Sequence, residues 1–221
     1  LVCIHAVDTR AIVRHIRDKG AMNCIISSEI DDVEELKKRL AAAPSMEGLE
    51  LASKVTTSEV KYYGDENSAF RIAALDFGMK KNIVRCMVER GCYVAVFPAK
   101  TSFDELNKFN PDGYFLSNGP GDPAAMDYAV DTVKEILEVD KPVFGICLGH
   151  QLLARAVDIP TYKMHHGHRG INHPVKNVDT GRCEITSQNH GFGVTPGAIE
   201  ENSDKVHITH MNLNDGTIEG I

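Results

Sequence analysis

The chain has 221 residues, 43% of them hydrophobic, and a formal net charge of −7 at pH 7. This length allows one large domain or two small ones, and the acidic balance argues against a nucleic-acid partner, which usually requires a basic patch. No apolar run approaches the roughly 20 residues that cross a bilayer, so no membrane partner is expected. The six cysteines form no Cys-x-x-Cys pair, and without a secretion signal we expect them reduced in a cytoplasmic protein.

The amino-terminal part of the sequence predicts a small α/β unit. Asp8 or Thr9 is placed to cap a helix that stops at Gly20. Asp31, with Glu34 three residues later, has the spacing of a capping box and predicts the start of a second helix. Two short apolar runs predict strands beside these helices, residues 1–7 and residues 22–27.

A linker is expected between this unit and the rest of the chain. Residues 44–67 lack a long periodic run and are rich in Ser, Thr, Gly and charge. We therefore expect the domain boundary near Ser68, with residues 1–67 as an amino-terminal part plus linker and residues 68–221 as the main domain.

From residue 68 to residue 157 predicted strands and helices alternate, which indicates βαβ units and a mostly parallel sheet covered on both faces. The strands are expected at residues 72–75, 93–97, 113–116 and 143–146, and the helices at residues 80–90, 103–109, 125–138 and 148–157. After residue 156 short strands between turns predict a mixed or antiparallel extension of the same sheet, and Asp215-Gly216 predicts a hairpin near its end.

Three turns at the carboxyl ends of predicted strands are candidate functional positions, because ligands bind at such ends in parallel sheets. They contain Asp76, Ser117 and Cys147. Residues 145–149, Gly-Ile-Cys-Leu-Gly, have the Gly-x-nucleophile-x-Gly spacing of a strained strand-to-helix elbow. The following helix is expected to lower the pKa of the Cys147 thiol through its dipole. The alternative is a buried structural cysteine.

A covalent attack on an amide also requires donors for the developing oxyanion. The backbone N–H of Leu148, the residue after the nucleophile, is one candidate. Residues 118–121, Asn-Gly-Pro-Gly, form a turn whose glycines permit close backbone approach, although an ordinary tight turn would look the same. Gln151 lies one helical turn after Cys147 and is placed on the same helix face.

Several segments together resemble the class I (triad) glutamine amidotransferases, and in particular the small, glutaminase subunits of carbamoyl phosphate synthetase. The resemblance lies in residues 144–151 (Phe-Gly-Ile-Cys-Leu-Gly-His-Gln), residues 116–123 (Leu-Ser-Asn-Gly-Pro-Gly-Asp-Pro), residues 187–192 (Ser-Gln-Asn-His-Gly-Phe) and residues 8–10 (Asp-Thr-Arg). It covers almost the whole chain, and the order of the motifs makes it more specific than any one of them.

This resemblance implies a flavodoxin-like amidotransferase domain preceded by part of a small α/β amino-terminal domain that contacts another subunit. It implies that Cys147 hydrolyses L-glutamine through a glutamyl thioester and that Gly121 donates to the oxyanion. The ammonia would pass to a large synthetase subunit, which would hold the ATP and metal, so no cofactor is expected on this chain. The glutamine pocket would be formed by Gly119, Gly121, Leu148, Gln151, Asn189, Gly191 and Phe192. Arginine and pyrimidine biosynthesis are implied in the same way.

The base of the triad is missing from this pattern. In the family the catalytic His and its Glu partner lie in a His-Pro-Glu motif, expected here after Ile221, and Val175 stands where that Glu would follow His173-Pro174. We therefore expect a chain truncated at both ends with weak or absent glutaminase turnover. His165, His166, His168 and His173 cluster in sequence, but glycines interrupt them and no carboxylate spacing accompanies them, so no metal site is expected.

Two other functions remain open at this stage. One is another class I amidotransferase, for example one that serves guanylate or anthranilate synthesis, although residues 8–10 and 189–192 argue against it. The other is an inactive scaffold or regulatory subunit, which the missing base keeps open.

Overall fold

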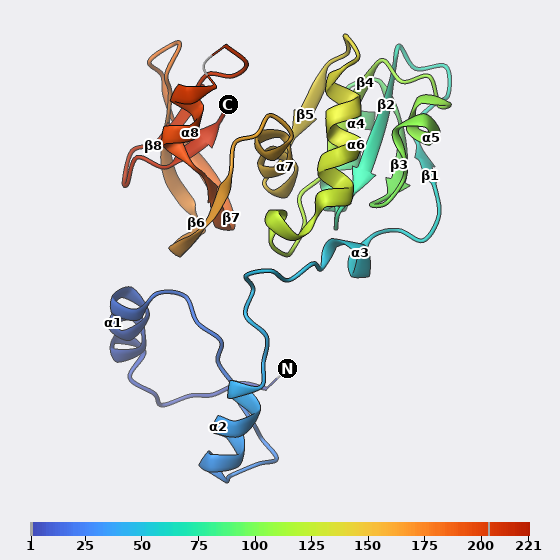
Figure 1. Cartoon of the computed structure of the whole chain (residues 1–221). Helices are drawn as coiled ribbons and strands as arrows, with labels where there is room; N and C mark the ends of the chain where they lie inside the picture. The colour runs from blue at the N-terminus through green and yellow to red at the C-terminus, as the bar shows by residue number, and fades with distance from the viewer. Residues whose placement is uncertain (1, 203) are drawn as a thin grey trace.

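A five-stranded sheet forms the centre of the computed structural model, which describes residues 2–202 and 204–221. Its strand order is β1-β3-β2-β4-β5 (Figure 1). Strands β2 (Phe70–Asp76), β3 (Cys92–Pro98), β4 (Gly113–Leu116) and β5 (Val143–Gly145) run parallel, and only β1 (Lys61–Tyr63) is antiparallel to its neighbour β3. The mostly parallel sheet predicted from the alternating pattern is confirmed.

Helices cover both faces of this sheet because alternate residues of each strand point to opposite sides. On one face Leu75 and Leu116 pack against α5 (Phe103–Asn107), α6 (Asp127–Leu137) and α7 (Leu148–Ala156). On the other face Val94 and Phe115 pack against Val84 of α4 (Lys81–Val88). A short 3-10 turn, η1 (Pro123–Ala125), precedes α6. The predicted helices are confirmed, with ends that differ by a few residues.

The carboxyl-terminal strands form a second sheet, and their expected role as an extension of the first sheet is wrong. This four-stranded sheet has the order β7-β6-β8-β9 and stands beside α7 in Figure 1. Its strands are β6 (Thr161–Asn177), β7 (Cys183–Val194), β8 (His210–Asn212) and β9 (Ile218–Gly220), with α8 (Pro196–Glu201) after β7. The hairpin predicted at Asp215-Gly216 is confirmed, because it joins β8 to β9.

A small apolar cluster fixes the second sheet against the first. It joins Ala154 of α7 to Val194 of β7, Ile199 of α8 and Ile218 of β9, all 3% exposed or less. Burial of these side chains removes apolar surface from water and so holds the two sheets on opposite sides of α7. The end of the parallel sheet at which Cys147 lies therefore faces the second sheet.

The amino-terminal segment contains two helices, and the strands predicted at residues 2–7 and 22–27 are wrong; Leu1 lies outside the described residues. In α1 (Thr9–Lys19) the Asp8 carboxylate accepts a hydrogen bond from the backbone N–H of Ala11, as the sequence predicts. In α2 (Val33–Ala41) the cap is Asp32 rather than Asp31. The apolar runs form no strand because no neighbouring strand among the described residues pairs with them.

The predicted linker at residues 44–67 is wrong in part, because it contains α3 (Ala52–Val55) and strand β1 of the central sheet. The main sheet therefore starts at Lys61, and the domain boundary near Ser68 stays a prediction. No helix within the described ranges has the length and apolar character that a membrane span requires.

Candidate active site

Cys147 occupies a strained turn between β5 and α7. Its backbone has φ 55° and ψ −106°, a combination that residues other than glycine rarely adopt. The two glycines of the motif make the turn possible: a Cβ on Gly145 would lie 2.6 Å from the Gly149 carbonyl carbon, and one on Gly149 would overlap the carbonyl oxygen of Leu116. The elbow predicted from the Gly-x-Cys-x-Gly spacing is therefore present, with the thiol at the amino end of α7.

The expectation that this position lowers the pKa of Cys147 is wrong. Burial of the half-buried side chain raises the pKa of the thiol, and the negative charge of Glu219 adds to this effect. Hydrogen bonds from the backbone N–H groups of Leu148 and Gly119, and the positive charge of Lys80, act in the opposite direction. Desolvation of the thiolate outweighs these contributions, so the thiol form predominates at neutral pH.

Gly119, in the predicted oxyanion turn, lies against Cys147, whereas Gly121 lies in another contact. The N–H of Gly119 faces the thiol, and a Cβ on Gly119 would overlap the carbonyl oxygen of Phe77. Gly121 has φ +106° and pairs with Glu50 in an isolated antiparallel bridge. The two N–H groups that point at the sulfur are thus those of Leu148 and Gly119, while the role expected for Gly121 stays a prediction.

The Gly119 turn is held in place by side chains at the ends of β2 and β4. Ser117 Oγ accepts a hydrogen bond from the N–H of Phe77 at 2.8 Å. The Asp76 carboxylate accepts three backbone N–H bonds, from Thr57, Gly78 and Met79. Both residues are buried. Of the three strand ends singled out in the sequence, two therefore support loops, and the third carries Cys147.

A cavity of about 500 Å³ lies between α7 and the second sheet, and Cys147 lines it. Of the predicted pocket residues, Gln151, Asn189 and Phe192 line the same cavity. Gln151 is buried and its Nε2 donates to the Phe192 carbonyl oxygen at 2.8 Å, while the Cys147 Sγ lies 4.0 Å from the Asn189 carbonyl oxygen. The predicted residues outside the cavity lining are Gly119, Gly121, Leu148 and Gly191.

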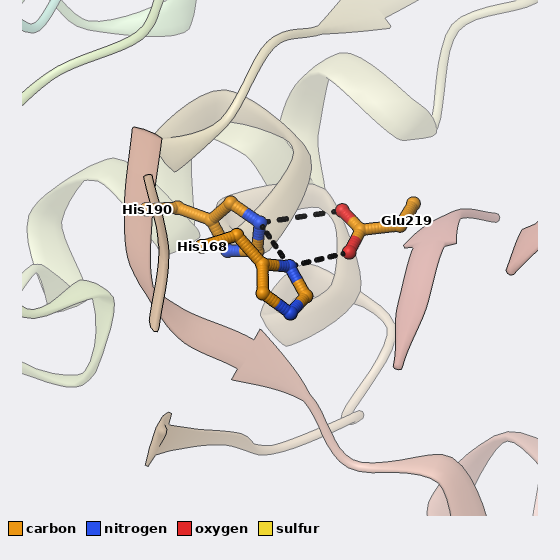
Figure 2. A group of neighbouring side chains, drawn as sticks. All are labelled: His168, His190 and Glu219. Atoms are coloured by element: carbon orange, nitrogen blue, oxygen red, sulfur yellow. Dashed lines mark hydrogen bonds and ion pairs between the residues drawn. The ribbon is translucent and has the colours of Figure 1, made fainter. Parts of the chain in front are cut away.

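A cluster of two histidines and a glutamate lies beside this cavity, and the sequence did not predict it. His168 comes from β6, His190 from β7 and Glu219 from β9, and Figure 2 shows their polar atoms turned toward one another. His168 Nδ1 lies 2.9 Å from Glu219 Oε1, and His190 Nε2 lies 3.3 Å from Glu219 Oε2. The spacing of these residues in the sequence does not predict the cluster, because they come together only through the strand pairing of the second sheet.

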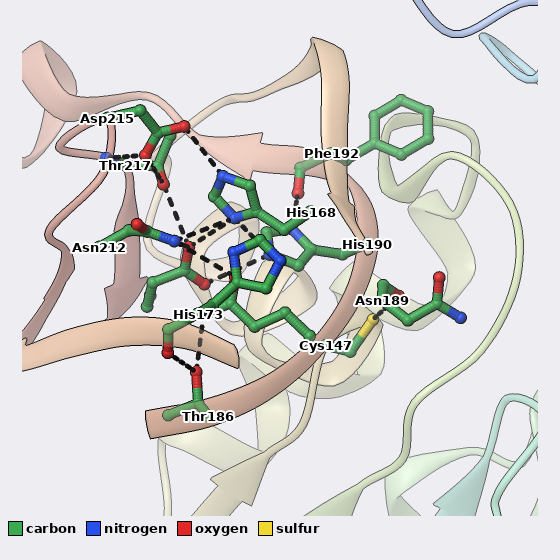
Figure 3. A network of polar contacts seen from close by, with 12 residues as sticks. Cys147, His168, His173, Thr186, Asn189, His190, Phe192, Asn212, Asp215 and Thr217 are labelled. Carbon is green, nitrogen blue, oxygen red and sulfur yellow. Dashed lines mark hydrogen bonds and ion pairs between the residues drawn. The ribbon is translucent and has the colours of Figure 1, made fainter. Parts of the chain in front are cut away.

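The surroundings of this cluster are polar, and its own three side chains are mostly buried. Figure 3 shows the network, in which Asp215 and Asn212 also contact His168, close to Cys147. Burial opposes the charged form of His190, but the hydrogen bonds to Glu219 and to the Phe192 carbonyl raise its pKa. At Glu219 burial raises the pKa, but the contact with His190 and the hydrogen bond from Thr217, together with the charge of His168, lower the pKa of that carboxyl overall.

His150, the residue after the elbow glycine, has a different environment. Its Nε2 is buried and has no hydrogen-bond partner within the described residues. Burial lowers the pKa of His150 to about 4, although the nearby Glu219 acts in the opposite direction. This imidazole is therefore neutral at physiological pH.

Comparison with known proteins places this geometry in a family. A sequence profile of the family described as Glutamine amidotransferase class-I matches residues 73–221. The carbamoyl phosphate synthase small chain of Chlorobaculum tepidum is 50% identical over 97% of this chain and 58% of the relative. The protein of the same name from Salmonella typhi is 45% identical over 100% of this chain and 61% of the relative. The chain thus spans about three fifths of the length of these relatives.

A solved structure shows the same fold at low sequence identity. It comes from Thermoplasma acidophilum and is described as that of a GMP synthase protein. The TM-score is 0.54 at 20% identity, with 67% of this chain and 75% of that chain covered. This likeness concerns the fold alone.

Proposed function

The chain belongs to the class-I glutamine amidotransferase family, and we propose that it is the glutamine-hydrolysing part of a carbamoyl phosphate synthase small chain. The observation that carries this proposal is Cys147 in a strained elbow, with two backbone N–H groups turned toward its sulfur. The identity of 50% to a protein named as such a small chain supports the choice within the family.

The proposed reaction is nucleophilic attack by the Cys147 thiolate on the side-chain carboxamide carbon of L-glutamine. A C–S bond forms, the carbonyl oxygen takes the negative charge, and the N–H groups of Leu148 and Gly119 stabilise it. When the intermediate collapses, the C–N bond breaks and the nitrogen leaves as ammonia with the proton released by the thiol. Water then hydrolyses the glutamyl thioester to glutamate and regenerates the thiol.

Substrate binding is proposed for the residues around the cavity. Gln151 is fixed by its bond to Phe192, so its amide keeps one orientation beside Cys147. Asn189 and Phe192 belong to β7, which forms the opposite wall. Gly119, Gly121, Leu148 and Gly191 complete the set expected from the family, mainly through their backbone groups.

The ammonia produced in this way requires an acceptor, and we propose that a large synthetase subunit takes it. The relatives are named small chains, which implies a larger companion. The proposal carries with it a cytoplasmic location and a role in arginine and pyrimidine supply. It is tested separately, by asking whether the chain co-purifies with a carbamoyl phosphate synthase large chain.

The catalytic assignment is tested with a glutamine analogue that carries a chloroketone in place of the carboxamide. Attack by the Cys147 sulfur displaces chloride and leaves a stable thioether, which intact mass spectrometry detects as one added group. We expect a single adduct that excess L-glutamine suppresses and that Cys147→Ser abolishes. Cys183→Ser is the matched control, because Cys183 is exposed and lies outside the cavity lining.

Two results would count against the assignment. An adduct that persists in Cys147→Ser would place the reactive thiol elsewhere in the chain. Labelling of Cys147 that L-glutamine does not suppress would show that the cavity does not recognise this amino acid, and the choice of substrate would fail.

A further inference from the structure

We propose that His168, His190 and Glu219 form a binding site for one divalent transition-metal ion, with Zn²⁺ as the best match. The three side chains each offer one ligand atom, and these atoms all lie within 4.8 Å of one another. Two imidazoles and one carboxylate are a ligand set that zinc uses in proteins, with a fourth position left for water or another group. The inference is independent of the proposed glutaminase function.

The hydrogen bonds behind the two rings direct a lone pair of each into the cluster. His190 Nδ1 lies 2.9 Å from the Phe192 carbonyl oxygen, and His168 Nε2 lies 2.9 Å from Asp215 Oδ2. A carbonyl and a carboxylate only accept, so both of these nitrogens carry the proton. In the neutral rings the opposite nitrogens, His168 Nδ1 and His190 Nε2, are then bare. A metal-binding histidine is oriented in this way by a carbonyl or carboxylate behind it.

The separations between the ligand atoms fit a tetrahedral site. Bonds of about 2.0–2.1 Å to a central ion place two ligand atoms about 3.3 Å apart. His168 Nδ1 and His190 Nε2 are 3.2 Å apart, and they lie near different oxygens of Glu219, 2.9 Å from Oε1 and 3.3 Å from Oε2, so the carboxylate has to turn slightly for one oxygen to face both nitrogens. The ion would thus require only small adjustments of side chains already in place.

Burial and charge favour a cation at this point. The side chains of His168, His190 and Glu219 are 8%, 13% and 11% exposed. The hydrogen-bond donors that the described residues place beside the two lone pairs and the carboxylate are neutral, Asn212 Nδ2 and Thr217 Oγ1, so a positive charge among them is favoured in this poorly solvated position. A divalent ion would balance the charges of Glu219 and Asp215 together, whereas a single proton on one ring balances only one of them.

Three strands of one sheet hold the ligands, which makes the site rigid. His168 and His190 are directly paired across β6 and β7, and Glu219 projects from β9. His190 and Glu219 also line the cavity that contains Cys147. An ion bound here would therefore fix the strand that carries Asn189 and Phe192 on the wall of that cavity.

The test is isothermal titration of the chelator-treated 221-residue chain with ZnCl₂, together with the visible spectrum of the Co²⁺-loaded chain. We expect one tight equivalent and the intense visible absorption of tetrahedral Co²⁺. Glu219→Gln keeps the size of the side chain but removes its charge, and we expect the affinity to fall at least about 100-fold. Asp215→Asn removes the carboxylate behind His168 and leaves the three ligands in place, and we expect a loss of about 10-fold.

Matched controls separate this site from adventitious binding. Glu135→Gln on α6 and His15→Ala on α1 remove an exposed carboxylate and an exposed imidazole, and both should leave the tight equivalent unchanged. Circular dichroism checks that each variant is folded before titration. The proposal is overturned if the chain binds no Zn²⁺ tighter than micromolar, or if Glu219→Gln binds it as the parent chain does.

Discussion

The pKa of the Cys147 thiol is set by several neighbouring groups that act in opposite directions. Its strained backbone aims the sulfur at two N–H groups, which stabilise a thiolate, but burial and the charge of Glu219 favour the thiol. The net result is a raised pKa, so the Cys147 thiol is mostly protonated at neutral pH. In the proposed reaction another group therefore has to assist the removal of its proton.

The raised pKa predicts a pH profile for alkylation of Cys147 by iodoacetamide. The thiolate is the reactive form, so the rate at Cys147 should climb to a higher pH than that of the thiol of a short cysteine peptide. Lys80→Ala removes a positive charge and should shift the midpoint further upward, whereas Glu219→Gln should shift it downward. Peptide mass spectrometry after timed quenching follows Cys147, with the short cysteine peptide as the reference in the same sample. A Cys147 midpoint below that of the reference peptide would contradict the prediction.

His150 predicts a loss of stability in mild acid. Its pKa falls from 6.5 in the unfolded chain to about 4 in the fold. Between these values the unfolded state binds more protons, so its contribution to stability is complete above about pH 6.5 and is lost as the pH falls toward 4. The shift corresponds to at most about 3 kcal/mol.

Urea unfolding of the parent chain and of His150→Gln, at a series of pH values, measures this contribution. The acid-induced loss should be smaller in the variant, because glutamine does not titrate. The pKa values of Asp215 and Glu219 are lowered, so their contributions to the stability of the fold are also lost in acid. Both residues are present in both proteins, so these contributions cancel in the comparison. Parallel curves for the two proteins would rule out a buried neutral His150.

At the scale of elements, the packing of α7 against β4 depends on Gly149. A Cβ at this position would overlap the Leu116 carbonyl oxygen. Leu116 and Leu148, the residue before Gly149, both belong to the hydrophobic core. We expect Gly149→Ala to lower the free energy of unfolding by about 3 kcal/mol or more, because backbone on both sides has to move. Thermal unfolding measures the loss, and adduct formation at Cys147 should fall with it.

A second glycine provides the control for this substitution. Gly197 in α8 has no atom within 4 Å of the position of a Cβ, so Gly197→Ala should be neutral or stabilise by up to about 1 kcal/mol through helix propensity. Equal losses in the two variants would mean that the close approach at Gly149 does not decide the stability of the elbow.

The same elements show what the sequence could and could not predict. Strands β2 to β5 were predictable because each is a short apolar run between turn residues, and Cys147 and Gln151 because they belong to one local motif. Residues 22–27 carry a similar apolar run but find no partner strand among the described residues. Strands β6 and β7 are long, but the sequence predicted several short strands in their place, because the pairing is interrupted by register shifts near Gly170. Glu219 could not be assigned, because its neighbours lie on other strands.

At the scale of the whole molecule, the proposed active site lies where the two sheets meet. The parallel sheet supplies Cys147, the proposed nucleophile, at the end of β5, and the second sheet supplies Asn189, Phe192 and the His–Glu cluster from the other side of α7. The apolar contacts of Ala154 with Val194 and Ile218 keep the two parts together. Substitutions that weaken this apolar cluster would thus open the cavity, although every polar residue of the site would be unchanged.

The amino-terminal helices make few contacts with this assembly, and their local stability should differ accordingly. Helices α1 and α2 bury no residue, and the apolar side chains of Val13 and Val33 are 64% and 59% exposed. Figure 1 shows both helices below the sheets, and the end of α1 contacts them, where the Ala21 N–H donates to the carbonyl oxygen of His165 in β6 at 2.8 Å. Few buried contacts hold these helices, so they open at a low free energy.

Hydrogen–deuterium exchange with peptide mass spectrometry measures this difference. We expect amides of α1 and α2 to exchange at least about 100-fold faster than those of α6 and of strand β4, whose side chains are buried. Addition of a large synthetase chain should slow exchange in the amino-terminal helices if they form part of its contact, while α6 serves as the internal reference. Protection of α1 equal to that of α6 in the isolated chain would contradict the prediction, because it would require contacts that cover the exposed apolar face of α1.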